Sequence, residues 1–299
     1  MGEEQNRRTT LLATVVLLAL AACWGSTFFL IKDLLDRVPT LDFLAVRFAI
    51  ASVALLLVAP RALTRLSPVV RKHAAVLGLL YGVAQILQTT GLAHTPASIS
   101  GFVTGLYVVF TPLLAAAILR TRIPPITWIA VAVATVGLGI LALRGFSVGY
   151  GELITLASAV LYALHIVGLG AWSTARDALG MTILQVMVIA LVCTMATVHD
   201  GIVLPTRTGD WMSVLYMAVI VGALGLLGQT WAQAHLPPTR TAIIMSMEPV
   251  FASLFAVWLG GEDVTTRLLL GGSMVLVAML TVELAPRRVV EGEVPHIAV

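Results

Sequence analysis

Charged residues are scarce in this sequence: they make up 11% of its 299 residues, against about a quarter in a soluble globular domain. Cysteine is also scarce, and the two cysteines, Cys23 and Cys193, both lie within apolar runs. Thiols in such surroundings are typical of small core residues and indicate neither a disulfide framework nor a metal centre. The composition therefore excludes an ordinary soluble domain.

The motifs of common enzyme classes are missing as well. The sequence has no HExxH zinc motif, no aspartate-rich diphosphate motif and no GxSxG turn, and its acidic residues are too scattered for a metal site. It also has no ATP-binding loop and no basic patch for nucleic acid. We therefore expect no enzyme activity, no cofactor and no nucleic-acid partner, so any pumping must use an ion gradient or the solute's own gradient.

Hydrophobic residues, by contrast, make up 59% of the chain, and apolar runs of the ~20 residues needed to cross a bilayer recur along its length. We predict an all-α polytopic membrane protein with ten transmembrane helices. The expected spans are Leu11–Ile31, Thr40–Ala59, His73–Ala93, Ala97–Leu119, Pro125–Leu143, Glu152–Ala171, Met181–Val198, Asp210–Ala234, Pro238–Glu262 and Leu268–Ala285.

The chain also matches itself at an offset of 141 residues, where Leu87–Arg120 aligns with Gly228–Gly261 without a gap. A Gln-Thr…Ala-His-x-Pro pattern recurs, with Gln88 falling on Gln229. We therefore divide the chain into a first repeat over residues 1–145, a second over 146–286 and a cytoplasmic tail over 287–299. Because five spans per repeat is an odd number, the second repeat enters the membrane from the opposite side. Such inverted repeats are characteristic of secondary transporters, whose sites lie near the midplane between the repeats.

Basic residues indicate the orientation of these spans. With both termini cytoplasmic, twelve Lys and Arg residues lie inside and five outside, which satisfies the positive-inside rule. The inside set is Arg7, Arg8, Arg61, Arg65, Arg71, Lys72, Arg120, Arg122, Arg176, Arg240, Arg287 and Arg288; the outside set is Lys32, Arg37, Arg144, Arg207 and Arg267. We expect a multi-pass protein of a bacterial-type plasma membrane.

Several short motifs, in this order and spacing, resemble those of the drug/metabolite transporter superfamily, specifically the EamA-type permeases. They are Trp24-Gly25-Ser26-Thr27-Phe28, Arg47-Phe48-Ala49, the stretch from Gln88 to Pro112, Met247-Glu248-Pro249-Val250 and Leu259-Gly260-Gly261-Glu262. The resemblance covers nearly the whole chain. It implies a ten-helix basket with helices 3, 4, 8 and 9 at its centre, helices 1 and 6 adding to a cavity, and helices 5 and 10 peripheral. It also implies export or exchange of small metabolites, often amino acids or drugs.

Polar residues on single helix faces are candidates for the wall of a solute cavity. In the third span, Tyr81, Gln85 and Gln88 recur at i, i+4 and i+7, so they share one face. In the eighth span Gln229 and Gln233 are spaced i, i+4, and Gln233 lies near the membrane edge. Glutamine can bind donors and acceptors on a solute, or it can join helices by hydrogen bonds.

A second set of candidates comes from the first and sixth spans. Trp24 and Thr27 are spaced i, i+3, and at an offset of 138 residues they fall on Tyr162 and His165. Aromatic walls suit an apolar or cationic solute, whereas the alternative is simple aromatic packing. His165 is either a proton carrier or a donor to a backbone carbonyl.

Ionisable residues inside spans are expected to face a partner or a cavity, and Glu248 and Arg47 are the strongly ionisable ones here. Glu248 precedes Pro249, which cannot donate its backbone N–H and so loosens the helix. Glu248 is then either a coupling residue that exchanges a proton or a residue that shapes the helix. The repeat places Tyr107 opposite Glu248, and Arg47 is either an anchor between helices or a gating residue.

The sequence thus favours a secondary transporter, an exporter or exchanger of small metabolites such as amino acids or drugs, working by alternating access. The alternatives are a non-transporting or lipid-flipping subunit and, less favoured, a membrane enzyme. We expect a small-molecule solute, the lipid bilayer as surroundings, and a monomer or homodimer. The predicted substrate-binding residues are Trp24, Tyr81, Gln85, Gln88, Tyr107, Tyr162, His165 and Gln229; the predicted coupling or gating residues are Glu248, Pro249 and Arg47.

Overall fold

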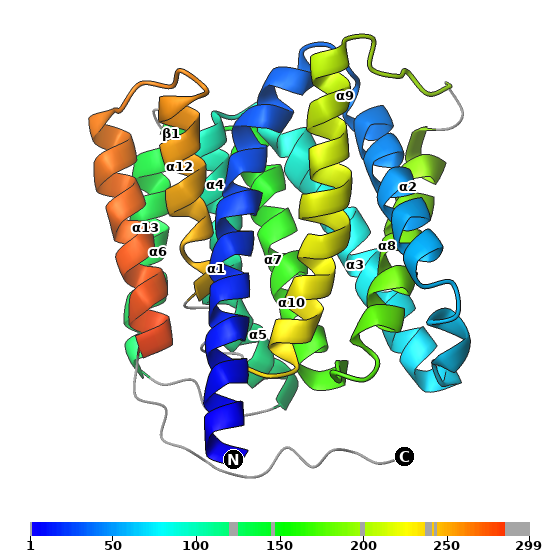
Figure 1. Cartoon of the computed structure of the whole chain (residues 1–299). Coiled ribbons are helices and arrows are strands. Elements are labelled where there is room, and N and C mark those ends of the chain that lie inside the picture. The colour runs from blue at the N-terminus through cyan, green and yellow to red at the C-terminus, as the bar shows by residue number, and fades with distance from the viewer. Residues whose placement is uncertain are drawn as a thin grey trace.

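The computed structural model describes residues 2–119, 125–144, 147–197, 201–236, 241 and 244–284, which form a bundle of long helices lying side by side (Figure 1). The first half contains α1 (Gly2–Leu35), α2 (Thr40–Val58), the 3-10 helix η1 (Leu63–Arg65), α3 (Pro68–Ala93), α4 (Ala97–Gly105), α5 (Tyr107–Leu119) and α6 (Pro125–Ala142). The second half contains α7 (Tyr150–Trp172), α8 (Ala178–Thr197), α9 (Thr208–Leu215), the π-helix η3 (Tyr216–Leu224), α10 (Gly225–Gln233), α12 (Glu248–Trp258) and α13 (Thr266–Leu284). Between the halves, strands β1 (Leu143–Arg144) and β2 (Ser147–Val148) pair antiparallel.

The helices have the length and composition of membrane spans. Seven segments are long and apolar enough to cross a bilayer, and three further apolar helices are shorter. The composition therefore predicted the all-helical membrane class correctly. The seven segments are Arg8–Leu35, Thr40–Val58, Pro68–Ala93, Ala97–Ile118, Tyr150–Trp172, Ala178–Thr197 and Thr208–Gln233; the shorter ones are Trp128–Leu141, Glu248–Trp258 and Thr266–Thr281.

Two of the predicted spans are interrupted. The predicted helix 97–119 divides at Leu106, whose N–H bonds to Val103 O at 3.2 Å and tightens the turn between α4 and α5. The predicted helix 210–234 contains nine residues of π-helix, η3, between α9 and α10. A π-helix widens the turn and leaves backbone carbonyls open to other partners, which a period of 3.6 residues does not reveal.

The third departure concerns the predicted helix 238–262, because α12 covers only Glu248–Trp258. Pro249 lies in the first turn of α12, where a missing N–H costs nothing. The helix ends before Gly261, which has φ +70° and so takes a backbone conformation that favours glycine. Residues 238–240 and 242–243 of this span, and the tail 287–299, lie outside the described residues.

Small residues bring the helices of the two halves close together. α1 and α4 both pack against α12, while α3 packs against α7 and α8. A Cβ on Gly25 of α1 would lie 2.6 Å from Phe251 Cβ, and one on Gly101 of α4 would lie 2.6 Å from Ala252 Cβ. Gly25 and Gly101 therefore permit the close approach that positions α1 and α4 beside α12.

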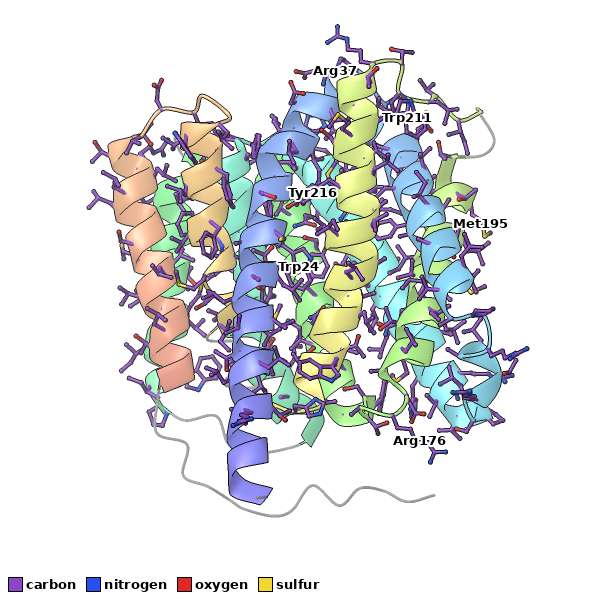
Figure 2. The ribbon with its side chains drawn as sticks, viewed as in Figure 1. Trp24, Arg37, Arg176, Met195, Trp211 and Tyr216 are labelled. Carbon is purple, nitrogen blue, oxygen red and sulfur yellow. The ribbon has the colours of Figure 1, made fainter. Side chains whose placement is uncertain are left out.

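Charged residues join loop and helix ends at the upper end of the bundle, where Figure 2 labels Arg37. Arg37 donates to Asp33 at 2.5 Å and to Asp210 at 2.8 Å, which ties the end of α1 to the start of α9. Hydrogen bonds to Asp33 and Asp210 raise the pKa of Arg37 above its ordinary value, so it stays charged. Asp42, at the start of α2, accepts from Thr197 and from the N–H of Val203.

Candidate functional site

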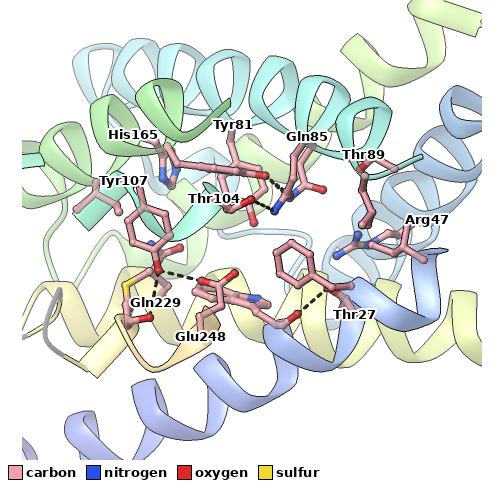
Figure 3. A pocket seen from close by; sticks show the side chains of 18 residues that line it. Thr27, Arg47, Tyr81, Gln85, Thr89, Thr104, Tyr107, His165, Gln229 and Glu248 are labelled. Carbon is pink, nitrogen blue, oxygen red and sulfur yellow. Dashed lines mark hydrogen bonds between the residues drawn. The ribbon is translucent and has the colours of Figure 1, made fainter. Parts of the chain in front are cut away.

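A cavity lies between the two halves of the bundle and is lined by side chains from both (Figure 3). Its volume is about 50 Å³, room for a few water molecules, whereas pockets for small ligands measure roughly 300–1,000 Å³. The cavity is therefore too small for a metabolite-sized solute unless the helices move. The lining residues are Trp24, Thr27, Phe28, Ile31, Arg47, Tyr81, Gln85, Gln88, Thr89, Leu92, Thr104, Tyr107, Tyr162, His165, Ile166, Gln229, Met245 and Glu248.

A chain of hydrogen bonds runs along one wall of the cavity. Gln85 Nε2 donates to Tyr162 Oη at 2.7 Å, and Tyr162 Oη donates to Gln88 Oε1 at 2.7 Å. Gln88 Nε2 in turn donates to Thr104 Oγ1 at 3.3 Å. These hydrogen bonds connect α3 with α7 and α4. Gln85 and Gln88 therefore both join helices and line the cavity, which are the two uses of glutamine considered from the sequence.

Glu248 meets its repeat counterpart at the start of α12. Tyr107 Oη donates to Glu248 Oε2 at 2.8 Å and lies 3.3 Å from Met245 O. Met245 is four residues before Pro249, so its carbonyl is the one that Pro249 cannot bond. The single Tyr107 hydroxyl is thus within hydrogen-bond distance of both the Glu248 carboxyl group and the Met245 carbonyl. This hydroxyl joins α5 to α12, and Glu248 is 6% exposed.

Two residues that line the cavity donate hydrogen bonds to carbonyls of the π-helix η3. Trp24 Nε1 donates to Val221 O at 3.2 Å, and Arg47 Nε donates to Met217 O at 3.1 Å. A Cβ on Gly225 would lie 3.0 Å from Trp24 Nε1, so the glycine leaves room for the indole. α1 and α2 are therefore fastened to carbonyls of η3 through side chains that face the solute space.

Aromatic rings cover the wall formed by α3 and α7. The Tyr81 ring lies edge-on to Tyr162, with centroids 5.3 Å apart, and to His165, at 5.0 Å. His165 Nε2 lies 2.9 Å from Gln185 Oε1 of α8. His165 therefore has a side-chain partner, not the backbone carbonyl considered as its alternative role.

All eight residues predicted to bind substrate line this one cavity, together with Arg47 and Glu248. Pro249 is not in the lining and instead packs near Gly105, whose Cβ would lie 3.0 Å from Pro249 Cγ. Sequence reasoning missed Thr89 and Thr104. Thr104 lies three residues before Tyr107, and Thr89 lies four after Gln85, so helical spacing from the predicted residues would have found both.

Two charged side chains that the sequence did not single out for this role hold the turn between α3 and α4, close to the cavity residues Thr89 and Leu92. Lys32 Nζ donates to Leu92 O and to Ala93 O, each at 2.9 Å, at the end of α3. Glu262 accepts from Ala97 N at 2.5 Å and from the N–H and hydroxyl of Ser98 at the start of α4. Cations at helix C-termini and anions at N-termini are stabilising, so the turn between α3 and α4 is held from both sides.

The residue types in the cavity lining indicate what the site could bind. Among those residues, no three His, Cys, Asp or Glu side chains come together as metal ligands would. The cavity combines one cation, one carboxylic acid, amides and aromatic rings. Such a lining suits reversible binding of a small polar molecule.

Comparison with known proteins gives the family. The model of the EamA-like transporter family matches residues 11–143 and again residues 149–284. An "Uncharacterized transporter" of Archaeoglobus fulgidus is 27% identical over 95% of this chain and 89% of its own length. The "Uncharacterized inner membrane transporter YedA" of Escherichia coli K12 is 24% identical, over 90% and 89%.

Two further similarities concern a named exporter and the fold. A "Probable terminal-alkyne amino-acid exporter" of Streptantibioticus cattleyicolor is 28% identical over 87% of this chain and 89% of its own length. One crystal structure with 19% sequence identity superposes with a TM-score of 0.66 and covers 94% of this chain and 98% of that one. These comparisons and the apolar helices establish a multi-pass membrane transporter. Matched along both of its halves, the chain belongs to the EamA-like transporter family.

Proposed function

We propose that this protein is a secondary transporter that exports or exchanges small metabolites, such as amino acids or drugs, by alternating access. The observation that carries the proposal is the cavity between the two halves, lined by polar and aromatic side chains from both and closed to about 50 Å³. A solute fits only after helices move, and such movement is what alternating access requires. The exporter name of the relative from Streptantibioticus cattleyicolor makes amino acids the first class to test.

The proposal includes ten spans arranged as two inverted repeats, residues 1–145 and 146–286. This arrangement is supported by residues at equivalent positions of the two repeats, which lie close together in the structure. Tyr107 and Glu248, which are 141 residues apart, share a hydrogen bond, and Gln88 and Gln229 both line the cavity. Pseudo-twofold symmetry between inverted repeats places counterparts in this way, on either side of an axis through the site.

We also propose that both termini are cytoplasmic and that the protein works in the plasma membrane as a monomer or homodimer. Arg176 lies at the lower end of the bundle, with the start of α1, and Arg37 lies at the upper end (Figure 2). Arg176 belongs to the larger set of basic residues assigned to the inside, so the lower end would face the cytoplasm.

Counterflow in proteoliposomes tests the function. Purified protein would be reconstituted in vesicles loaded with one unlabelled amino acid, and uptake of the same radiolabelled amino acid would be followed across a panel of them. We expect transient accumulation of at least one amino acid above the level in protein-free vesicles. Lipid scrambling without counterflow of any amino acid or drug in the panel would instead support the lipid-flipping alternative.

A further inference from the structure

Arg47 stands out among the lining residues because it is a cation without a carboxylate partner. It lies in the middle of α2, is 4% exposed, and is the only Lys or Arg among the described residues that line the cavity. Its Nε donates to Met217 O at 3.1 Å, and its guanidinium carbon lies 5.0 Å from the centre of the Phe48 ring. These contacts hold the side chain in place.

The same contacts leave the outer part of the guanidinium available. A guanidinium has five N–H donors, and the bond to Met217 O uses the one on Nε. Figure 3 shows the terminal nitrogens directed toward the interior of the cavity, with Glu248 some way along it. No described carboxylate lies within 4.0 Å of Arg47, and Glu248 is instead bonded to Tyr107.

Burying an unpaired charge away from water costs free energy unless a group of opposite charge binds to it. The planar fork of a guanidinium matches the two oxygens of a carboxylate, and such charge-assisted pairs are stronger than neutral hydrogen bonds. A single guanidinium balances the one charge of a carboxylate. The second negative charge of a phosphate would find no second Lys or Arg among the described residues that line the cavity.

We propose that Arg47 is the carboxylate-binding residue of the cavity, so that the solutes of this transporter carry a carboxylate group. The proposal rests on the transport function given above and specifies its substrate class. The terminal N–H groups of Arg47 hold the two carboxylate oxygens, while Phe48 and Met217 fix the guanidinium. The aromatic side chains of Trp24 and Tyr81 then contact the body of the solute.

Matched acids and amides test this proposal. Thermal stabilisation and binding of the purified full chain would be measured with 3-phenylpropanoate and 3-phenylpropanamide, and with L-leucine and L-leucinamide. Each pair differs in its carboxylate. We expect the acid to bind at least about tenfold more tightly than the amide, since a charge-assisted pair replaces a neutral contact.

Substitutions of Arg47 test whether this residue causes the preference for acids over amides. Arg47→Gln should abolish the difference between acid and amide, while Arg65→Gln, which removes an exposed arginine from η1, should retain it. Arg47→Lys, which keeps the charge but loses the planar fork, should reduce the ratio several-fold. If size-exclusion chromatography shows that Arg47→Gln does not fold, Arg47→Lys is compared with the wild type in its place.

Three outcomes overturn the proposal: no stabilisation by either acid, equal binding of acids and amides by the wild type, or an undiminished preference in both Arg47 variants. Counterflow separates this proposal from the transport function. Acid binding without counterflow of any solute in the panel would refute transport and leave the role of Arg47 intact. Counterflow that accepts leucine and leucinamide equally would refute the role of Arg47 and leave transport intact.

Discussion

At the scale of single residues, Glu248 is the group most suited to couple transport to an ion gradient. It is a carboxylic acid in the cavity, and its bond from Tyr107 leaves one carboxyl oxygen free of that partner. We hypothesise that it exchanges a proton during the transport cycle. His165, which lies against Tyr81 and bonds to Gln185, is the alternative carrier.

Glu248→Gln should therefore keep counterflow but lose the response of transport to an imposed pH gradient. The amide oxygen of Gln still accepts from Tyr107, so the fold is kept, while the side chain no longer exchanges a proton. Transport driven by a pH gradient in proteoliposomes measures this, with Asp263→Asn, at an exposed acid that does not line the cavity, as the control. Full pH-driven transport by the Gln variant at normal expression would leave Glu248 as a helix-shaping residue.

Trp24 shows how a cavity residue also contributes to stability. Trp24→Phe removes the indole N–H that bonds to Val221 O, and we expect a loss of about 1 kcal/mol. The midpoint of thermal unfolding in detergent measures the change. Trp128→Phe alters an indole that is 57% exposed and should leave the midpoint nearly unchanged. Equal effects of the two substitutions would show that the bond to η3 contributes nothing.

At the scale of helices, the position of α1 depends on Gly25. Gly25→Ala places a Cβ 2.8 Å from the backbone nitrogen of Ala252, so α1 or α12 must shift. We expect a cost of about 1–3 kcal/mol. Gly209→Ala in α9, where a Cβ meets nothing within 4 Å, is the matched control and should be neutral or slightly stabilising. A thermal midpoint for Gly25→Ala equal to that of the wild type would contradict close packing of α1 on α12.

The turn between α3 and α4 should control access from the upper end of the cavity. Lys32→Met combined with Glu262→Gln removes both charged caps, and the ends of α3 and α4 should separate more often. A cysteine in place of Thr89, in a chain with Cys23 and Cys193 replaced by alanine, would report entry of a water-soluble thiol reagent. We expect faster labelling in the double variant.

Asp263→Asn supplies the control for this experiment, since Asp263 is exposed and lies directly after Glu262. It should label at the rate of the parent chain. Unchanged labelling in the double variant would show that Lys32 and Glu262 only stabilise the two helix ends and do not restrict access.

At the scale of the whole molecule, orientation in the membrane follows from the distribution of basic residues. Reporter fusions after Arg65 should report the cytoplasm, and fusions near Ser147 should report the outside. The predicted cytoplasmic fusion after Arg122 lies outside the described residues. An external signal at Arg65 would overturn both the orientation and the inverted-repeat arrangement, because the two depend on the same count of spans.

Much of the cavity wall could be predicted because helical spacing is a local property. Residues at i, i+4 and i+7, such as Tyr81, Gln85 and Gln88, share a face wherever the helix is placed. The internal repeat also relates Gln88 to Gln229, and this relation is read from the sequence alone. Scarcity of charge and recurring apolar runs determined the membrane class in the same way, since the bilayer restricts which segments can cross it.

Contacts between distant segments were decided only by the tertiary structure. The side chains that bond to the π-helix, and the caps from Lys32 and Glu262, come from segments that lie far away in sequence. The cavity volume of about 50 Å³ likewise reflects how closely the helices pack. Sequence periodicity specifies which face of a helix is polar, but the distance between two faces is set by every side chain packed between them.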